Sequence, residues 1–411
     1  MKNSNNRVYA PRSTSKSTTA ELSTTPLSKN LLAARFNITS DLILRKEYSK
    51  AAKKLKALLA NTEFKEGWVN LGSCYKELKE WQLAKDCFNR ALEVPYANGE
   101  IERDSISLHN LGALEYICSN DLEARQWFWE AMQKDPNNLE AKWNYGTTGI
   151  RMFTDGKDVN FLEAWFYYDT RFRLYDLSVL EEHELWDFRS SWPSEDIVLL
   201  RDQGFGDTLM FARYISELEK YFRRVYVQCL PEMSGLFKHV YRGGEGIRFA
   251  APICSLGKLL DYIPSGEWIG GWKEGGSGVG CVWQGSRGHP NDMNRSCPVA
   301  YFDSLDCLKY TLAPGISRKG YTHLEGNNWL DTIENLKKLK LVITVDTAIA
   351  HLCGSIGMPC WVLMPLTYSD YRWGTNTEKC AWYDSVTIIR NPGSWDKVFE
   401  KVKEKLHEEN Y

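Results

Sequence analysis

Three polar loops of this chain follow short apolar runs, and each carries side chains that could do chemistry. The first loop is RDQGFGDT (201–208). Gly204 and Gly206 let its backbone turn sharply beside Gln203. Asp207 stands where a helix should begin. Its carboxylate is therefore either a helix cap or, if the loop lines a cleft, a general base that takes a proton from an attacking hydroxyl group.

The second loop, WQGSRGHPNDMNRS (283–296), is more polar than a connector chosen for packing would be. Arginine side chains present planar sets of N–H donors and serine hydroxyl groups add further donors, a combination that suits a diphosphate. A solvated loop without a ligand is the alternative. The side chains that supply these donors are Ser286, Arg287, Arg295 and Ser296.

The third loop follows the apolar run 341–345 and opens with Asp346 and Thr347, whose side chains can accept hydrogen bonds from the first N–H groups of a helix. The helix would begin at Ala348 and carry His351. A helix N-terminus at the carboxyl end of a parallel strand attracts phosphate groups. Two alternatives remain, because a lone histidine is more often a packing residue than a ligand contact and a β-α-β unit need not bind anything.

These loops are set in alternating strand-like and helix-like segments. Apolar runs at 341–345 and 360–364 flank the helix of the third loop and predict a β-α-β unit. The same alternation begins near residue 197 and again near residue 279, and the glycine-rich segment 271–280 between them predicts a hinge. The sequence therefore predicts two Rossmann-type α/β halves, 181–275 and 276–411, with a cleft between them.

The preceding segment, 29–180, is helical and repeated. One copy of the tetratricopeptide pattern, in which small residues mark the crossing of two helices, falls on Trp68, Leu71, Gly72, Tyr75, Ala84, Phe88 and Ala91. A second copy, offset by 40 residues, falls on Leu108, Leu111, Gly112, Ala124, Phe128, Ala131 and Pro136. Partial copies lie on either side, at Tyr48, Ala51 and Leu55 and at Trp143, Gly146, Ala164 and Tyr168. Such repeats predict an α-solenoid whose concave groove either binds a partner or supports the next domain.

Composition and charge exclude several classes of protein. The 411 residues carry a net charge of −2, which gives no general attraction to nucleic acid or to anionic membranes. The first 60 residues nevertheless hold 12 Lys and Arg against 3 Asp and Glu. Residues 1–28 predict a disordered basic tail, either a solvated arm or an arm for nucleic acid.

The cysteines and carboxylates give no sign of a metal site. The 11 cysteines form no CxxC pair, and no pair of carboxylates has the spacing of metal ligands. No apolar run is long enough to span a membrane. We therefore expect reduced cysteines, no bound metal, no membrane span and a cytoplasmic location.

With these motifs in order, the chain resembles proteins that join tetratricopeptide repeats to a glycosyltransferase domain similar to the heptosyltransferase family, that is, glycosyltransferase family 9-like. The resemblance runs from about residue 45 to the C-terminus. It is carried by DQGFGDTLMFARY (202–214), VWQGSRGHPNDMNRSCP (282–298), VDTAIAHLCGSIGMPCWVLMP (345–365), DYRWGTNTEKCAWYDSVTIIR (370–390), the joint Leu185–Asp187 and the helix start Asp331–Thr332. It implies a GT-B fold, in which the C-terminal half holds a nucleotide sugar and the N-terminal half faces the acceptor.

The resemblance also implies roles for the three loops. The catalytic base falls on Asp207, and the acceptor-side loop on Gln203, Gly204 and Gly206. Contacts with the donor sugar and its diphosphate fall on Gln284, Gly285, Ser286, Arg287, Arg295, Asp346, Thr347, Ala348 and His351. The relatives invert the anomeric centre by direct displacement without a metal ion or cofactor. Phe205, where leucine is usual, and the glycine-rich stretch 243–280 depart from the family pattern.

We therefore expect an inverting, metal-independent glycosyltransferase that moves a sugar from a nucleotide sugar to an acceptor hydroxyl group. The acceptor would be a protein, a glycan or a modified nucleobase, recruited by the repeat groove and the basic arm. One alternative is an inactive repeat scaffold that only binds partners, although polar groups on all three loops favour the enzyme. A nucleotide-sugar epimerase is a further alternative that gives no account of the repeats.

Overall fold

The computed structural model describes residues 26–95, 100–174, 183–186, 188, 194–201, 203–259, 268–269, 271–289, 291–312, 318–364, 369–390, 394–409 and 411. Residues 1–25, which make up most of the predicted tail, and Asp187 of the predicted joint lie outside this range. The chain forms two compact units. The first, called the repeat unit below, comprises Met1–Gly149 and Phe166–Leu174. The second, called the sheet unit, comprises Ile150–Trp165 and Tyr175–Tyr411.

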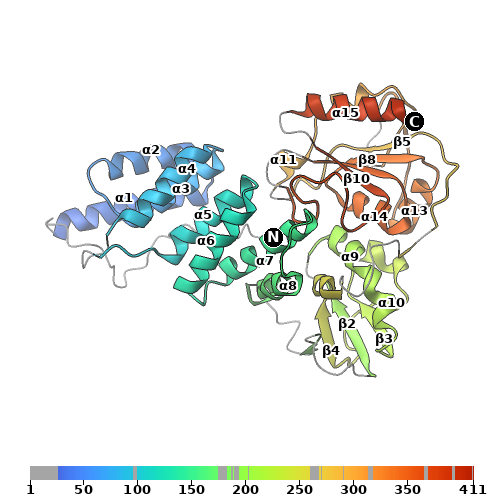
Figure 1. Ribbon diagram of the computed structural model, residues 1–411, viewed down its shortest axis with the longest axis horizontal. Helices are drawn as coiled ribbons and strands as arrows, with labels where there is room; N and C mark the ends of the chain where they lie inside the picture. Colours follow the sequence, from blue (N-terminus) through green and yellow to red (C-terminus); the bar gives the residue numbers. More distant parts are fainter. Residues whose placement is uncertain are drawn as a thin grey trace. The chain divides into compact units, whose positions relative to one another are not determined.

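Consecutive helices pair as hairpins along the first part of the chain (Figure 1). The helices are α1 (Pro26–Leu44), α2 (Tyr48–Leu59), α3 (Lys65–Glu77), α4 (Trp81–Glu93), α5 (Ser105–Ile117), α6 (Asp121–Lys134), α7 (Leu139–Thr154) and α8 (Phe161–Tyr168). Helix α1 begins at Pro26, so the end of the predicted tail, residues 26–28, belongs to a helix.

The same left-handed turn closes each of the four hairpins. It contains Lys46, Lys79, Ser119 and Gly156, whose φ angles are 61°, 64°, 66° and 73°. In the second hairpin the N–H of Lys79 donates to the carbonyl of Lys76 (3.1 Å) and the N–H of Glu80 to that of Tyr75 (2.9 Å). The other three turns repeat this pair of bonds, which satisfies the last carbonyl groups of each first helix.

Small residues sit where the two helices of a hairpin cross. A Cβ atom on Gly72 would lie 2.6 Å from the ring of Phe88, and one on Gly112 would lie 2.7 Å from the ring of Phe128. Both rings are almost wholly buried. The glycines therefore let an aromatic ring pack directly on the opposite backbone, which confirms the predicted helical repeat.

A four-stranded parallel sheet forms the N-terminal half of the sheet unit, in the order β1-β4-β2-β3. Its strands are β1 (Glu184–Leu185), β2 (Asp196–Leu200), β3 (Arg224–Val227) and β4 (Phe249–Pro252). The helix predicted after β2 is interrupted. Helix α9 (Phe205–Phe211) passes through a 3-10 turn, Ala212–Tyr214, into α10 (Ile215–Leu218).

A six-stranded parallel sheet forms the C-terminal half, in the order β10-β9-β8-β5-β6-β7. Its strands are β5 (Val279–Val282), β6 (Lys309–Thr311), β7 (Tyr321–His323), β8 (Leu341–Val345), β9 (Cys360–Met364) and β10 (Val386–Arg390). Its helices are α11 (Asp292–Arg295), α12 (Val299–Asp303), α13 (Trp329–Leu336), α14 (Ala348–Ile356) and α15 (Trp395–Glu408).

Helices cover both faces of this sheet. In Figure 1, α15 lies on one side of β8 and β10, and α13 and α14 lie on the other. Leu341, Ile343 and Val345 pack in the core that also contains Phe399 of α15. Burial on both faces explains why β8 is an uninterrupted apolar run. The predicted fold class, a helical repeat followed by two parallel α/β halves, is thus confirmed.

The glycine-rich segment 271–280 is packed against the C-terminal half. The indole Nε1 of Trp272 donates to the carbonyl of Leu339 (3.2 Å), and its backbone N–H donates to that of Ile356 (3.3 Å). A Cβ atom on Gly276 would lie 2.5 Å from the carbonyl oxygen of Leu339. These contacts hold the segment against the C-terminal half, and its role as a hinge stays a prediction.

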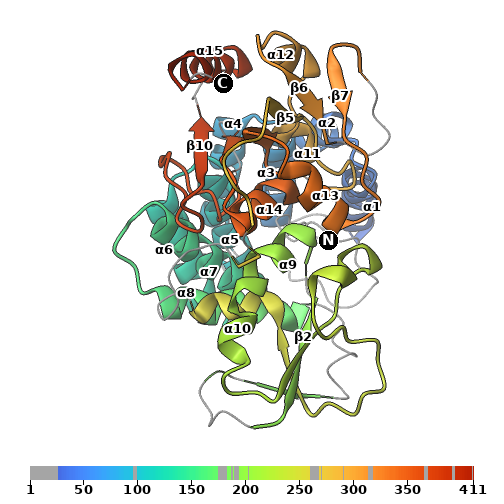
Figure 2. The ribbon, with the colours of Figure 1, turned by 90° about the vertical axis from the view of Figure 1, so that its right-hand side faces the viewer.

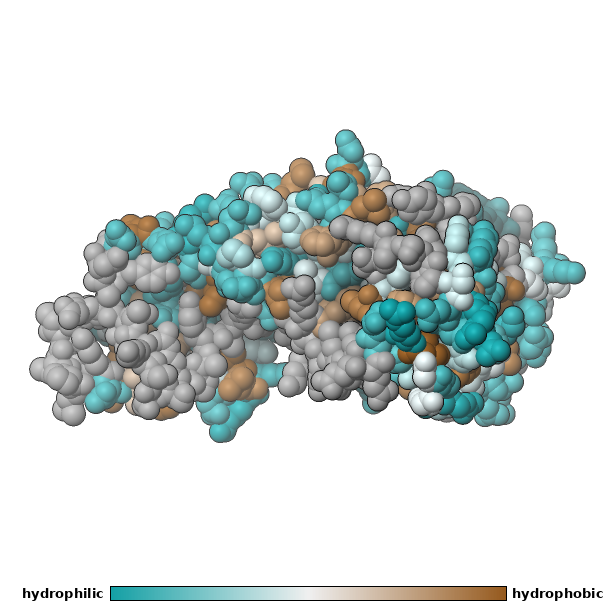
Figure 3. All heavy atoms as spheres, turned by 90° about the horizontal axis from the view of Figure 1, so that it is seen from below, coloured by the Kyte–Doolittle hydropathy of each residue, from teal (hydrophilic) through white to brown (hydrophobic). Residues whose placement is uncertain are grey.

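Exposed large hydrophobic side chains are scattered over the described surface. Figure 3 shows them as separate brown areas among hydrophilic residues. The most exposed are Met293 and Leu122, at 95% and 71% of their accessible area. Scattered side chains of this kind are normal on protein surfaces. None of the helices in the described part of the chain is both long and apolar enough to cross a membrane.

Candidate functional site

Asp207 is the third residue of α9, directly beyond the carboxyl end of β2. Gly204 precedes the helix, and its N–H donates to Oδ2 of Asp207 (3.0 Å). The other carboxylate oxygen, Oδ1, accepts from the guanidinium of Arg372 in a buried ion pair. Asp207 is therefore not the first residue of the helix as predicted, because α9 begins at Phe205 with Gly204 as its N-cap. Its carboxylate accepts from the Gly204 N–H and also pairs with a charge from a distant segment.

That segment is Ser369–Asn376, which we call the strap. Its Arg372 lies between two carboxylates, because Nη1 donates to Oδ1 of Asp370 (2.7 Å) while Nη2 reaches Asp207. No role was predicted for the strap residues from the sequence. The signal was present, since DYRWG places two charges and two aromatic rings together soon after a buried strand.

Asp370, one of the two carboxylates that contact Arg372, lies close enough to Asp346 for their charges to interact. Asp370 is about one-third exposed, with a side-chain value of 30%. Burial and, to a smaller extent, the negative charge of Asp346 together raise the pKa of Asp370 to about 7, against the opposing effects of the Arg372 backbone N–H and of nearby arginines. Asp346 is in turn fixed by the strap, because the indole Nε1 of Trp373 donates to its Oδ1 (2.8 Å).

Helix α14 begins differently from the prediction. Thr347 precedes its first residue, Ala348, but the Thr347 side chain makes no capping bond. Its Oγ1 lies 2.9 Å from Oγ1 of Thr344. The capping predicted for the Thr347 side chain is therefore wrong. The Asp346 carboxylate accepts a hydrogen bond from Trp373, a contact that was not predicted. The Thr347 side chain therefore does not occupy the first-turn N–H groups of α14, and these groups form the positive end of the helix dipole.

The loop after β5 is tied to the same place by Arg295. Its Nη1 donates to the backbone carbonyl of Asp346 (2.9 Å), and its Nε lies 3.4 Å from Oδ1 of Asp292. A Cβ atom on Gly285 would lie 2.3 Å from Nη2 of Arg295, so glycine leaves the room that the guanidinium occupies. Arg295 is only 8% exposed and holds two loops together.

Other residues of this loop remain open to solvent. Ser286 and Arg287 are exposed, and Gln284 is partly exposed. Arg295 is buried and Arg287 is exposed, so the two differ in what they can contact, although both were predicted to bind the diphosphate.

His351 is a buried residue that faces the first half. It is 4% exposed, and its ring stacks on Trp373 with centroids 4.9 Å apart. Its Nδ1 lies 3.1 Å from the hydroxyl of Tyr383. A Cβ atom on Gly206 would lie 2.8 Å from its Cδ2, so the glycine of the first loop lets the two halves approach. Burial, with a smaller effect of Arg213, lowers the pKa of His351 to about 3, which keeps the ring neutral.

Helices α9 and α14 lie side by side in both views (Figures 1 and 2). The indole Nε1 of Trp268 bridges them, since it lies 2.9 Å from the carbonyl of Leu209 and 2.9 Å from Oγ of Ser355. Phe205 adds a contact on the same side, with its ring 5.3 Å from that of Trp329. The structure therefore joins Gly206 and Asp207 from one half to Asp346 and His351 from the other. We call the group Asp207, Asp346, His351, Asp370, Arg372 and Trp373 the Asp207 cluster.

The rest of the acceptor-side loop is less enclosed. Gly204 is exposed, and the backbone carbonyl of Gln203 lies 3.5 Å from Nη1 of Arg201. Among the described residues, no group of three or more His, Cys, Asp or Glu side chains is arranged to hold a metal ion.

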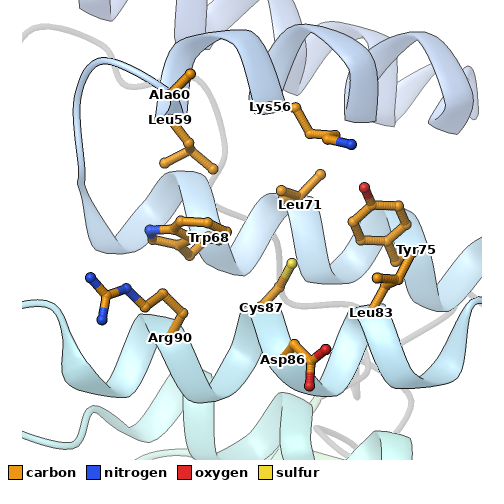
Figure 4. Close-up of a pocket in the computed structure, with 10 residues that line it drawn as sticks. All are labelled: Lys56, Leu59, Ala60, Trp68, Leu71, Tyr75, Leu83, Asp86, Cys87 and Arg90. Atoms are coloured by element: carbon orange, nitrogen blue, oxygen red, sulfur yellow. The ribbon is translucent and has the colours of Figure 1, made fainter.

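The repeat unit contains a separate cavity of about 460 Å³ (Figure 4). Helix α3 contributes Trp68, Leu71 and Tyr75, which lie between side chains of α2 and α4. Most of the lining is apolar. Its charged members are Lys56, Asp86 and Arg90.

No protein-family model matches the sequence, and no curated protein sequence matches it. Among solved structures, an O-GlcNAc transferase mutant from Thermobaculum terrenum has a TM-score of 0.36 and 10% identity over 93% of this chain and 90% of its own. A family 9 glycosyl transferase from Veillonella parvula has a TM-score of 0.32 and 11% identity, covering 52% of this chain and 91% of its own. YrrB, described as a TPR protein with an unusual peptide-binding site, has a TM-score of 0.27 and 19% identity, covering 35% of this chain and 70% of its own.

The matched structures belong to the two classes that the sequence resembles, tetratricopeptide-repeat proteins and glycosyltransferases. Their TM-scores and identities are low. We therefore base the assignment of function on the sequence motifs and on the geometry of the Asp207 cluster.

Proposed function

We propose that this protein is an inverting, metal-independent glycosyltransferase that moves a sugar from a nucleotide sugar to an acceptor hydroxyl group. The observation that carries the proposal is the Asp207 cluster. It connects a carboxylate at the start of α9 in one half to the N-terminus of α14 in the other through Arg372 and Trp373. Displacement at an anomeric carbon needs a proton acceptor on one side and stabilisation of an anionic leaving group on the other.

Asp207 is the proposed proton acceptor. As the acceptor oxygen attacks the anomeric carbon, its proton passes to the Asp207 carboxylate, and the bond from that carbon to the diphosphate oxygen breaks on the opposite face. The nucleoside diphosphate leaves with the electron pair, and the configuration inverts. Each carboxylate oxygen has more than one lone pair, so Asp207 can accept the proton while Arg372 keeps it aligned.

The departing diphosphate would be stabilised by the second and third loops. Ser286 and Arg287 are exposed and can approach a bound donor. The first N–H groups of α14, at Ala348, add the positive end of a helix dipole. Arg295 is already engaged with Asp346 and Asp292, so we assign it a positioning role.

His351 is also proposed as a positioning residue, because it is buried between Trp373, Tyr383 and Gly206. In this position it fixes the distance between the loop that carries Asp207 and the start of α14. A direct contact with the donor would require its ring to become exposed.

We propose that the repeats recruit the acceptor, a protein or a glycan. The cavity between α2, α3 and α4 offers an apolar surface with charged edges for such a molecule. Nothing in the described part of the chain favours a nucleic-acid acceptor, and the net charge of −2 gives no general attraction to one.

A thermal-shift panel of nucleoside diphosphates and nucleotide sugars, without metal and with a chelator, tests donor binding. A ligand that binds only the folded protein raises the unfolding midpoint by mass action. We expect a clear shift with one nucleotide base. If well-folded protein shows no shift with any member of the panel, the protein is a repeat scaffold instead.

Asp207→Asn tests the chemistry with the donor that this panel selects. We expect release of nucleoside diphosphate to fall by about 10²- to 10⁴-fold, the usual contribution of a general base, while the donor-induced shift persists. The control is Glu217→Gln on α10, which removes a partly exposed carboxylate paired with Lys220 and should leave turnover unchanged. Equal turnover in Asp207→Asn would remove this residue from the mechanism.

A further inference from the structure

The last helical hairpin holds the end of the strap through a single carboxylate. Asp155 lies in the turn between α7 and α8 and accepts from the backbone N–H of Thr375 at 2.8 Å and 3.0 Å. It also accepts from the Thr375 hydroxyl (2.5 Å) and from the N–H of Asn376 (3.2 Å). A carboxylate that accepts several hydrogen bonds fixes the orientation of the loop that donates them.

The same hairpin holds the beginning of the strap. Arg151 on α7 is fully buried, and its Nη1 donates to the carbonyl of Ser369 (3.3 Å). Gly374 shows how closely the strap approaches, because its φ is 67° and a Cβ atom on it would lie 2.3 Å from Oδ1 of Asp155. Only glycine fits this position without strain.

The hairpin also packs on the first half of the sheet unit. Trp165 on α8 is fully buried, and its ring meets that of Phe211 on α9 edge to face at 5.7 Å. A Cβ atom on Gly257 would lie 2.1 Å from the Trp165 ring. Residues 150–165 therefore contact both the helix that carries Asp207 and the strap that pairs with it.

These contacts form a continuous series from Asp155 through the strap to Arg372 and then to Asp207. We propose that Asp155 and Arg151 are positioning residues for the reaction at Asp207, so that the last hairpin of the repeat array is a working part of the catalytic unit. The catalytic unit then begins at Ile150 rather than at residue 181, where the sequence motifs alone begin. The reaction named here rests on the proposed function.

A hinge-like link between repeats and enzyme would behave differently. It would leave the strap unchanged when a side chain of α7 or of its turn is altered. If Asp155 is a positioning residue, loss of its carboxylate should make the strap more mobile. Arg372 would then no longer hold Asp207 in a fixed position. A small displacement of reacting groups is enough to slow a reaction by a large factor.

The test uses full-length Asp155→Ala, with Asp158→Ala as the matched control. Asp158 is an exposed carboxylate in the same α7–α8 connection, three residues away. Hydrogen–deuterium exchange of the peptide that spans the strap reports on the Thr375 and Asn376 amides without any need for activity. We expect these amides to exchange at least about tenfold faster in Asp155→Ala and at the wild-type rate in Asp158→Ala.

Steady-state kinetics supply the second readout. We expect kcat to fall by about tenfold or more in Asp155→Ala with the KM for the donor nearly unchanged, because the donor loops are not altered. Asp155→Asn keeps one acceptor oxygen and should recover part of the loss. If Asp155→Ala does not fold, Thr375→Val, which removes only the hydroxyl donor, takes its place in both measurements.

Unchanged exchange in the strap, or increased exchange with unchanged kcat, would overturn the positioning role. Absence of transfer in the wild-type protein would be a failure of the proposed function. The exchange experiment would then still decide whether Asp155 holds the strap.

Discussion

Glycine makes room for a neighbour in both units of this protein, but the neighbour differs. In the repeat unit, Gly72 and Gly112 lie under Phe88 and Phe128, rings of the same hairpin that are 16 residues further along the chain. In the sheet unit, Gly206 lies under His351, a residue from the other half. The first arrangement packs apolar surface, and the second brings polar groups together.

We infer that the glycine contacts inside a hairpin contribute to stability, whereas the glycine contact between the two halves contributes to activity. A ring on a glycine inside a hairpin excludes water and is repeated wherever the hairpin is repeated. A histidine or a guanidinium against a glycine fixes one unique contact between loops. We therefore expect the same Gly→Ala change to reduce stability in the repeat unit and to reduce activity in the sheet unit.

The largest effect should come from Gly206→Ala. The added methyl group would meet His351 at 2.8 Å, and His351 is held by Trp373 and Tyr383, so the loop that carries Asp207 must move. We expect kcat for transfer to fall by about 10²-fold. Ser216→Ala on α10 is the control, since this side chain is exposed and lies outside the three loops and the Asp207 cluster. Similar kinetics for the two variants would show that the approach of Gly206 to His351 has no functional role.

A stability effect without loss of activity is expected for Gly112→Ala. The methyl group would lie 2.7 Å from the buried ring of Phe128, and overpacking of a core usually costs about 1 to 3 kcal/mol. Urea unfolding of the repeat helices, followed by circular dichroism, measures this loss. The thermal shift caused by the donor should persist. Loss of the donor-induced thermal shift would mean that the repeat unit contributes to the donor site, contrary to the expectation that Gly112 affects stability alone.

The smallest effect concerns Asp370 and pH. Its pKa is raised from 3.8 to about 7, so its protonated form is favoured in the folded protein. The stability associated with this protonation is present below about pH 4 and is lost as the pH rises through about 7. The side chain is 30% exposed, so we expect a contribution of about 1 kcal/mol or less. Unfolding midpoints of wild type and Asp370→Asn, compared between pH 4 and 8, should diverge over this interval and run parallel above it.

His351 supplies the contrast within the same cluster. Its pKa is lowered from 6.5 to about 3, so in contrast to Asp370 its contribution makes stability rise with pH between these values, because only the unfolded chain binds the proton there. This contribution is shared by wild type and Asp370→Asn and therefore cancels in the difference between them. If the difference between wild type and Asp370→Asn stays constant over the whole interval, Asp370 does not titrate there.

The sequence was most informative where the deciding contacts are close along the chain. The tetratricopeptide pattern could be recognised because Gly72 and Phe88 belong to one hairpin. The β-α-β unit could be recognised because β8 is apolar apart from Thr344 and the helix follows at once. In both cases local spacing reflects the packing directly.

The contacts that build the candidate site are long-range. Arg372 and Asp207 are 165 positions apart, and Asp155 and Thr375 are 220 apart, so no local pattern pairs them. Thr347 shows a related limit. Its type and position predict a helix cap, but its hydroxyl group forms a hydrogen bond with the hydroxyl group of Thr344 instead. The 3-10 turn between α9 and α10 is likewise unmarked in the sequence, because the segment 207–214 contains no proline or glycine.

The place of the last hairpin limits how the number of repeats can change. The hairpins up to α6 contain the same left-handed turn, and stacked repeats of this kind contact mainly their neighbours, so one pair of helices can be duplicated or lost without removing a unique contact elsewhere. The pair α7–α8 carries Arg151, Asp155 and Trp165, each with a unique partner in the sheet unit. Gene rearrangements should therefore lengthen or shorten such chains only ahead of α7, and that final pair should be inherited together with the sheets.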